Sequence, residues 1–279
     1  MNVFYYIYFL ILGTAVGSFL GVVVDRLASK ESVWKGRSHC DHCRHNLAPI
    51  DLIPLVSFFI LGQKCRYCHK RLSWFYPVIE VFTGVCFLLA SVAILQQTDL
   101  LLSQIGTQLL LLYYLSLISC LIVIFFTDFR YGIIPFKIVV IAFILALIWE
   151  ILLPYLGFSL LTIHLLGIQN NFISVLLSAL GAGGFFLLIF LATKGRGMGF
   201  GDVVYAFLMG FILGFPLIIV GLYLAFVAGA AVSLSLVLLK KKKFRGGTIP
   251  FGPFLAFGTI ISLFYGAQLL SYTMQFLTF

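Results

Sequence analysis

The sequence predicts an all-α polytopic membrane protein with about eight transmembrane helices. Three observations predict this fold class. The chain of 279 residues is 62% hydrophobic and 10% charged, with a mean hydropathy of +1.13, which is more apolar surface than one soluble core requires. Apolar runs of about 20 residues, long enough to cross a bilayer as helices, recur along it. Lys and Arg are confined to alternate gaps between these runs.

The apolar runs give the expected helices in order. We place them at residues 3–24, 77–95, 107–127, 133–153, 172–193, 203–216, 219–239 and 250–272. Basic residues follow the first, third, fifth and seventh runs, and the last group includes the lysines at 240–243. Positively charged loops stay in the cytoplasm, so we expect a cytoplasmic (inner) membrane protein with cytoplasmic basic loops and both termini outside.

The net charge of +9 is accounted for by this sorting of positive loops. The aromatic and basic interleaving typical of nucleic-acid binding is missing, so we expect membrane lipids and no nucleic acid among the partners. The lysine run is interpreted as an anchor at anionic headgroups. A hydrophilic loop, 25–76, divides the first two helices. We therefore separate residues 1–95, which carry this cytoplasmic loop, from a six-helix membrane domain at 107–279.

Two CxxC pairs lie in this loop: Cys40 with Cys43, and Cys65 with Cys68. Four thiolates suit tetrahedral zinc, because each pair can present two sulfurs from one tight turn. Two disulfides or four free thiols are the alternatives, although disulfides are rare in the reducing cytoplasm. Closed four-cysteine zinc sites are structural. The sequence therefore predicts a zinc-ribbon-like loop, with the nearby histidines solvated or supporting the ligands.

Two aspartates stand at the ends of predicted helices. Asp128 closes the third and Asp202 opens the sixth. An ionisable group in a bilayer is costly and needs a reason. Because these helices run in opposite directions, both carboxylates are expected at the same cytoplasmic depth, as an aspartyl dyad requires. The alternative is that Asp128 pairs with a cation such as Arg130 and that Asp202 merely caps its helix.

The remaining polar features of the helices are Glu80, Glu150 and a glycine-rich stretch. Glu80 lies at the cytoplasmic start of the second helix, where a negative charge also favours a helix N-terminus. Glu150, near the outer end of the fourth helix, is assigned no role. The glycines at 195–201 follow no strand, so they are not a dinucleotide-binding loop. Gly199 and Gly201 are instead expected to let the backbone approach a substrate closely.

At these residues the chain resembles the type IV prepilin peptidases, bifunctional leader peptidases and N-methyltransferases of the GxGD aspartyl protease class. The matching motifs, in the family's order, are Gly17-Ser18-Phe19-Leu20 with residues 23–27, Arg37-Ser38-His39-Cys40-Asp41-His42-Cys43, Asp51-Leu52-Ile53-Pro54-Leu55-Val56-Ser57, Cys65-Arg66-Tyr67-Cys68, Tyr76-Pro77-Val78-Ile79-Glu80, residues 128–135, Gly197-Met198-Gly199-Phe200-Gly201-Asp202 and residues 249–255. The chain departs from the family at Gly21, where Asn is usual, and at Val204, where Lys is frequent. Gly21 lies in the part linked with methyl transfer.

The resemblance implies an enzyme that cleaves the basic leader of type IV prepilins or pseudopilins and methylates the new N-terminus with S-adenosylmethionine. It implies that Asp128 and Asp202 carry proteolysis, and it makes Glu80 and loop 25–76 candidates for the methyltransferase part. Two other functions are open: a peptidase with an inactive methyltransferase half, and a non-enzymatic transporter subunit that uses the aspartates for ions. Transport would favour carboxylates near mid-bilayer.

Overall fold

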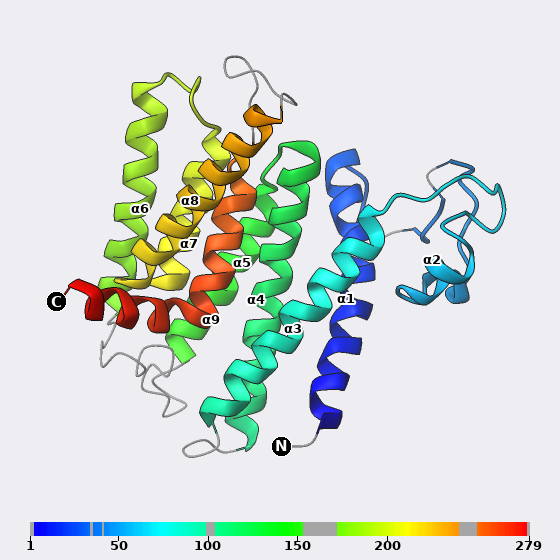
Figure 1. Ribbon diagram of the computed structural model, residues 1–279, viewed down its shortest axis with the longest axis horizontal. Coiled ribbons are helices and arrows are strands. Elements are labelled where there is room, and N and C mark those ends of the chain that lie inside the picture. The colour runs from blue at the N-terminus through cyan, green and yellow to red at the C-terminus, as the bar shows by residue number, and fades with distance from the viewer. Residues whose placement is uncertain are drawn as a thin grey trace. The chain divides into compact units, whose positions relative to one another are not determined.

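The computed structural model describes residues 3–33, 36–40, 42–98, 104–152, 172–239 and 250–277. The elements that these residues form are all helices, and the all-α prediction is confirmed (Figure 1). The helices are α1 (Val3–Ser29), the 3₁₀ turn η1 (Pro49–Leu52), α2 (Val56–Ile60), α3 (Phe75–Thr98), α4 (Gln104–Tyr131), α5 (Phe136–Leu152), α6 (Phe172–Ala192), α7 (Phe200–Leu213), α8 (Leu217–Leu238) and α9 (Gly252–Leu277). The lysines at 240–243 and the gap 154–171 were expected loops and lie outside the described residues.

Among the described residues, six helices are long and apolar enough to cross a membrane. They are α1, α3, α4, α6, α8 and α9. The prediction of about eight exceeds this number because two further apolar helices are shorter: α7 has 14 residues and α5 has 17 described residues. At 1.5 Å per residue, 14 residues extend about 21 Å, which is less than the roughly 30 Å of a hydrocarbon core. The chain is a multi-pass membrane protein.

The chain forms two compact units, Met1–Phe126 and Thr127–Phe279. In the first, α1 and α3 pack so closely that glycine is required at their crossing. A Cβ on Gly13 would lie 2.7 Å from the Cα of Gly84, and one on Gly17 would lie 2.8 Å from the Cα of Glu80. Small residues that let helix backbones approach are the usual device for packing helices in lipid, where apolar burial gives no advantage.

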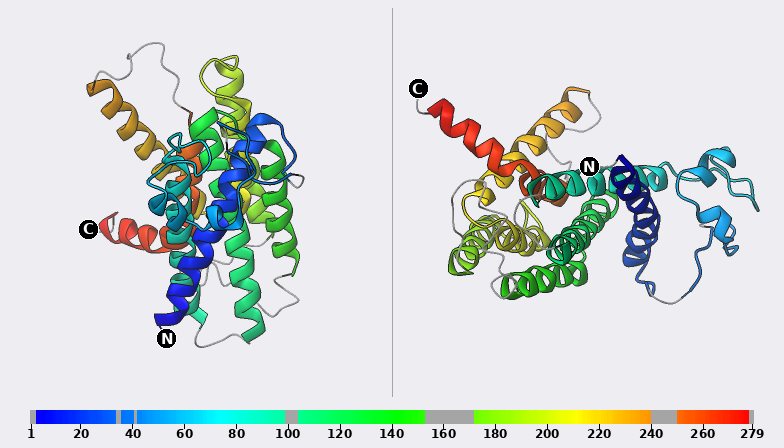
Figure 2. Two further views of the ribbon diagram at one scale, coloured as in Figure 1. Left: turned by 90° about the vertical axis from the view of Figure 1, so that its right-hand side faces the viewer. Right: turned by 90° about the horizontal axis from the view of Figure 1, so that it is seen from below.

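In the second unit, α7 is the central helix. It packs against α5, α6, α8 and α9, and its buried residues run along its whole length. A Cβ on Gly210 would meet the carbonyl oxygen of Ser178 on α6 at 2.5 Å. One turn after Asp202, the buried Tyr205 hydroxyl lies 3.0 Å from that of Thr259 on α9. The start of α7 is therefore held in place by its neighbours, with Asp202 in its first turn. Figure 2 shows the same helices from two further directions.

Candidate active site and metal centre

The two predicted catalytic aspartates come together in the second unit. Asp128 lies in the last turn of α4 and Asp202 in the first turn of α7. Both are buried, with 5% and 7% of their surface exposed, and they are close enough for their charges to interact. Two adjacent buried carboxylates cannot both be charged without large cost, so such a pair holds a proton between them. Such a pair can supply a general acid and a general base at one site.

Glycines on two helices leave room for the pair. A Cβ on Gly252, at the start of α9, would lie 2.5 Å from Oδ2 of Asp128, and the Gly252 backbone N–H donates to that carboxylate. A Cβ on Gly201 would lie 3.0 Å from Cβ of Ile134. Ile134 also lies 3.0 Å from the position of a Gly252 Cβ, so this side chain fills the space between the two glycines. Any larger residue at 252 must displace the Asp128 carboxylate.

Asp202 also caps its own helix. Its Oδ2 accepts a hydrogen bond from the Gly199 N–H at 3.1 Å, the reach of a residue at the third helical position back to the N-cap. Helix capping and a place in the acid pair are therefore compatible, because one carboxylate oxygen suffices for the cap. Gly199 itself is exposed, and the nearest atom to a Cβ there would be Oδ2 of Asp202 at 3.7 Å. Arg130, the expected cation for Asp128, lies over the Tyr131 ring at 5.2 Å.

In the first unit the four predicted cysteines converge on one point. The Sγ atoms of Cys40, Cys43, Cys65 and Cys68 all lie within 4.8 Å of one another. The Cys40 and Cys68 sulfurs are 3.9 Å apart and all four are free thiols. Sulfurs at tetrahedral corners, each about 2.3 Å from zinc, would be about 3.8 Å apart. The cluster therefore has the geometry of a four-cysteine metal site, and the disulfide alternative does not describe this structure.

The two CxxC turns are built alike, 25 residues apart. In the first, the Cys40 N–H donates to His45 and the Arg44 N–H donates to Cys40; in the second, the Cys65 N–H donates to Lys70 and the His69 N–H to Cys65. The flanking residues pair as isolated antiparallel bridges, His39 with Asn46 and Lys64 with Arg71. In the sequence the repeat can be recognised only by the cysteines, because it is formed by backbone hydrogen bonds. Each turn presents two sulfurs to the same point.

The surroundings of Cys65 favour its thiolate. Burial opposes ionisation, but the backbone N–H groups of Cys68 and Tyr67 and the neighbouring Cys40 and Cys68 thiols together lower the pKa of Cys65 to about 7. Deprotonated sulfur is the form that binds metal. Of the histidines, His45 stacks on Tyr67 with ring centroids 3.8 Å apart, and His42 is exposed.

Glu80 lies between three segments of the first unit. Only 6% of it is exposed, on the second turn of α3. Its Oε2 accepts the Leu55 N–H at 2.8 Å, and Ser18 on α1 hydrogen-bonds to the same carboxylate. The Glu80 carboxylate thus joins both helices to the cysteine loop. A charge favouring the helix N-terminus explains neither partner, so Glu80 stays a candidate for a specific role.

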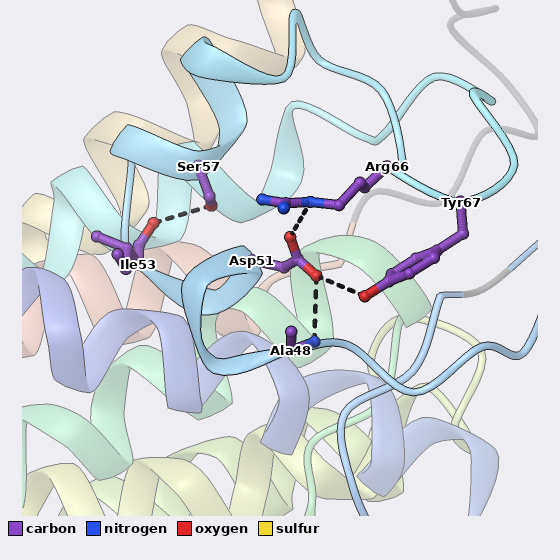
Figure 3. Close-up of polar contacts among 6 residues, drawn as sticks. All are labelled: Ala48, Asp51, Ile53, Ser57, Arg66 and Tyr67. Carbon is purple, nitrogen blue, oxygen red and sulfur yellow. Dashed lines mark hydrogen bonds and ion pairs between the residues drawn. The ribbon is translucent and has the colours of Figure 1, made fainter.

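Sequence reasoning did not find the residues that support the loop. Asp51, with 3% of its side chain exposed, pairs with Arg66 at 2.8 Å and accepts hydrogen bonds from the Tyr67 hydroxyl and the Ala48 N–H at 3.3 and 3.1 Å (Figure 3). Arg26, at the end of α1, donates to four carbonyls of the following turn, those of Ser32, Val33, Gly36 and Arg37. Their charge and position could have indicated this role, because Asp51 lies in the motif at residues 51–57 and Arg26 lies in the last turn of α1.

Comparison with known proteins finds relatives over nearly the whole chain. The family model described as "Bacterial Peptidase A24 N-terminal domain" matches residues 11–94, and the one described as "Type IV leader peptidase family" matches residues 115–234. A prepilin leader peptidase/N-methyltransferase of Bacillus subtilis is 29% identical over 265 residues, which cover 95% of this chain and 96% of that protein. One from Pseudomonas aeruginosa is 28% identical over 97% of this chain and 93% of its own length. No solved structure matches.

The fold and the buried acid pair define a multi-pass membrane enzyme of the aspartic class. The chain belongs to the type IV prepilin leader peptidase/N-methyltransferase family. The matched segments include both sites: the four cysteines and Glu80 lie in the first, and Asp128 and Asp202 in the second.

Proposed function

We propose that this protein removes the leader peptide of type IV prepilins or pseudopilins by aspartyl catalysis at Asp128 and Asp202. The observation that carries the proposal is the pair of buried carboxylates at the end of α4 and the start of α7. The ionised carboxylate takes a proton from water, which then attacks the peptide carbonyl. The protonated carboxylate polarises that carbonyl and then protonates the departing amine.

Specific groups of this chain support the pair. The Gly252 N–H donates to the Asp128 carboxylate and the Gly199 N–H donates to that of Asp202. These donors hold the two side chains in fixed orientations, so the substrate meets a preorganised pair. Gly199 and Gly201 carry no side chain on either side of Phe200 at the start of α7, and we assign the backbone at these two glycines to substrate approach. The substrate carries its own apolar helix, which lies in the bilayer. A dyad in a membrane domain lies in the same plane as this substrate, so the reacting groups are close together before any chemistry.

We further propose that the first unit methylates the new N-terminal amine. The support is the family model that covers residues 11–94 and the double name that its relatives bear. S-adenosylmethionine would supply the methyl group. Glu80 is the candidate residue, because a carboxylate held by Ser18 and the Leu55 N–H can accept hydrogen bonds from an amine or take its proton.

The metal of the first unit is proposed to be zinc with a structural role. Four thiolates and no open position suit zinc that folds its loop and performs no chemistry. The positive-inside rule places this loop, the acid pair and the basic gaps on the cytoplasmic side, and both termini outside. We propose the cytoplasmic (inner) membrane as the location on that ground.

Mass spectrometry of a co-expressed prepilin tests both activities at once. Loss of the leader reports the peptidase, and a gain of one methyl group reports the methyltransferase. Cleavage without methylation would indicate a peptidase whose methyltransferase half is inactive. Gly21, where the chain departs from the family, would then be the first position to examine. If the prepilin shows neither change and the purified protein transports protons or cations, the transporter alternative is favoured.

A further inference from the structure

An apolar segment of the cysteine loop, residues 52–61, lies outside the four-cysteine cluster and outside the acid pair. Its sequence, Leu-Ile-Pro-Leu-Val-Ser-Phe-Phe-Ile-Leu, contains one hydroxyl and no charge. It comprises the end of η1 and all of α2. We propose that this segment is a membrane-interface wedge: it lies at the boundary between lipid headgroups and acyl chains, and its partner is the bilayer.

The wedge turns its apolar side chains outward. Ile60 is 79% exposed and Phe59 is 59% exposed, and Val56 and Ile53 are also exposed. Phe58 faces the other way, 6% exposed, and packs against Trp74 with ring centroids 5.2 Å apart. In water such a segment would be expected to bury its larger apolar side chains, so its outward face calls for an apolar partner.

The depth of the wedge follows from Glu80. The Leu55 N–H donates to the Glu80 carboxylate, and Glu80 lies inside the membrane-length part of α3, Phe75–Ile94. Glu80 is the fifth residue after Phe75, which places it about 8 Å further along the helix axis. Interfacial helices bury their apolar face by about 5–10 Å. Figure 1 draws α2 within the cysteine loop, which joins the first turn of α3.

Trp74 marks the same level. It directly precedes the membrane-length part of α3, is 55% exposed and has its ring 6.4 Å from that of Phe59. Tryptophan is enriched where membrane meets water, because its ring is apolar and its N–H needs a polar partner. The outward face of the wedge is thus continuous with the lipid-facing start of a membrane helix.

The backbone of the wedge suits an environment without water. Pro54 has no N–H, the Leu55 N–H reaches Glu80, and Ser57 directs both its N–H and its hydroxyl to the Ile53 carbonyl, at 3.1 and 2.9 Å (Figure 3). The Phe59 and Leu61 N–H groups donate to Leu55 and Ser57. In lipid, backbone polar groups must find such internal partners.

The other end of the wedge is fixed to the polar part of the loop. Asp51, the residue before it, is held by Arg66 and Tyr67 of the second CxxC turn. Exposed basic residues, Lys64 and Arg71 among them, follow the wedge and suit anionic headgroups. The loop therefore presents exposed apolar side chains followed along the chain by exposed cations, which is the chemistry that a lipid surface accepts.

Tryptophan quenching in lipid vesicles tests the wedge. The three native tryptophans are replaced by phenylalanine, and Ile60→Trp or Phe59→Trp is added. The control is Glu31→Trp, an exposed residue just after the end of α1. The full-length protein is reconstituted in vesicles of phosphatidylethanolamine and phosphatidylglycerol, with or without bromine on the acyl chains. Metal content equal to that of the wild type verifies the fold of the loop.

Brominated chains are expected to quench Ile60→Trp and Phe59→Trp about twofold and to leave Glu31→Trp nearly unchanged, since only the former lie at acyl depth. Acrylamide, which stays in water, should quench Glu31→Trp more strongly than Ile60→Trp and Phe59→Trp. Acrylamide access to Ile60→Trp equal to that of Glu31→Trp would overturn the proposal. Shielding from both quenchers would overturn it too, because a protein surface would then cover the wedge. If the tryptophan-free background loses metal, the differences between the variants are measured with the native tryptophans retained.

Discussion

At the scale of single residues, the acid pair depends on a glycine outside the aspartate motifs. Gly252→Ala would place a Cβ 2.5 Å from Oδ2 of Asp128, so the carboxylate must turn away from its N–H donor. We expect prepilin cleavage to fall at least tenfold, since misplacing a catalytic group by about 1 Å can cost up to a hundredfold. The control is Gly181→Ala, where a Cβ meets nothing within 4 Å. Equal cleavage by both variants would show that Gly252 does not position Asp128.

The cysteine cluster gives a second residue-scale prediction. Elemental analysis of the purified protein should find one zinc per chain, and replacing Cys40 or Cys65 should release it, because closed sites need all four ligands. The loop should then become protease-sensitive before the membrane helices unfold, since the metal contributes the folding energy of its own segment. Cys86→Ser, a change in a membrane helix outside the cluster, should retain the metal. Zinc retained after loss of Cys40 or Cys65 would exclude this ligand set.

At the scale of helices, the crossing of α1 and α3 distinguishes two neighbouring glycines. Gly17→Ala forces a Cβ to within 2.8 Å of the Glu80 backbone, whereas at Gly21 the nearest atom is an Ile79 methyl at 3.4 Å. Gly17→Ala should therefore destabilise the protein by about 1–3 kcal/mol, the usual cost of overpacking. Gly21→Ala should be near neutral. Thermal unfolding of both variants in detergent, monitored through the release of metal, compares their stabilities. A larger loss at Gly21 would contradict the observed packing.

The helices were predictable where the pattern is local. The apolar runs along the chain predicted the membrane helices. The order of these runs also predicted that Asp128 and Asp202 lie at the same membrane depth, because the helices that carry them cross the membrane in opposite directions. The short length of α7 was not predicted, since an apolar run does not tell whether lipid or other helices surround it. Contacts between distant segments, such as Gly252 with Asp128 and Leu55 with Glu80, leave no periodic trace. The apolar residues 52–61 were likewise merged into a loop read as hydrophilic.

At the scale of the whole molecule, two compact units carry two sites, so the proposed activities should be separable. Replacing Cys65 and Cys68 together should lower methylation more than cleavage, because losing a structural metal disorders its own loop. Glu80→Gln should act in the same direction if its carboxylate serves methyl transfer. The measurement is the cleaved but unmethylated fraction of a co-expressed prepilin. A parallel fall of both activities in these variants would show that the loop supports the entire enzyme.

The central claim is that Asp128 and Asp202 form the peptidase dyad, and mass spectrometry of a prepilin co-expressed with single variants tests it most directly. Asp128→Asn and Asp202→Asn should each reduce leader cleavage at least a hundredfold, the usual scale of losing an acid–base group, while the protein still inserts and binds metal. Glu150→Gln, a membrane-helix carboxylate without an assigned role, should cleave like the wild type. Cleavage within about tenfold of the wild type by either aspartate variant would contradict the dyad.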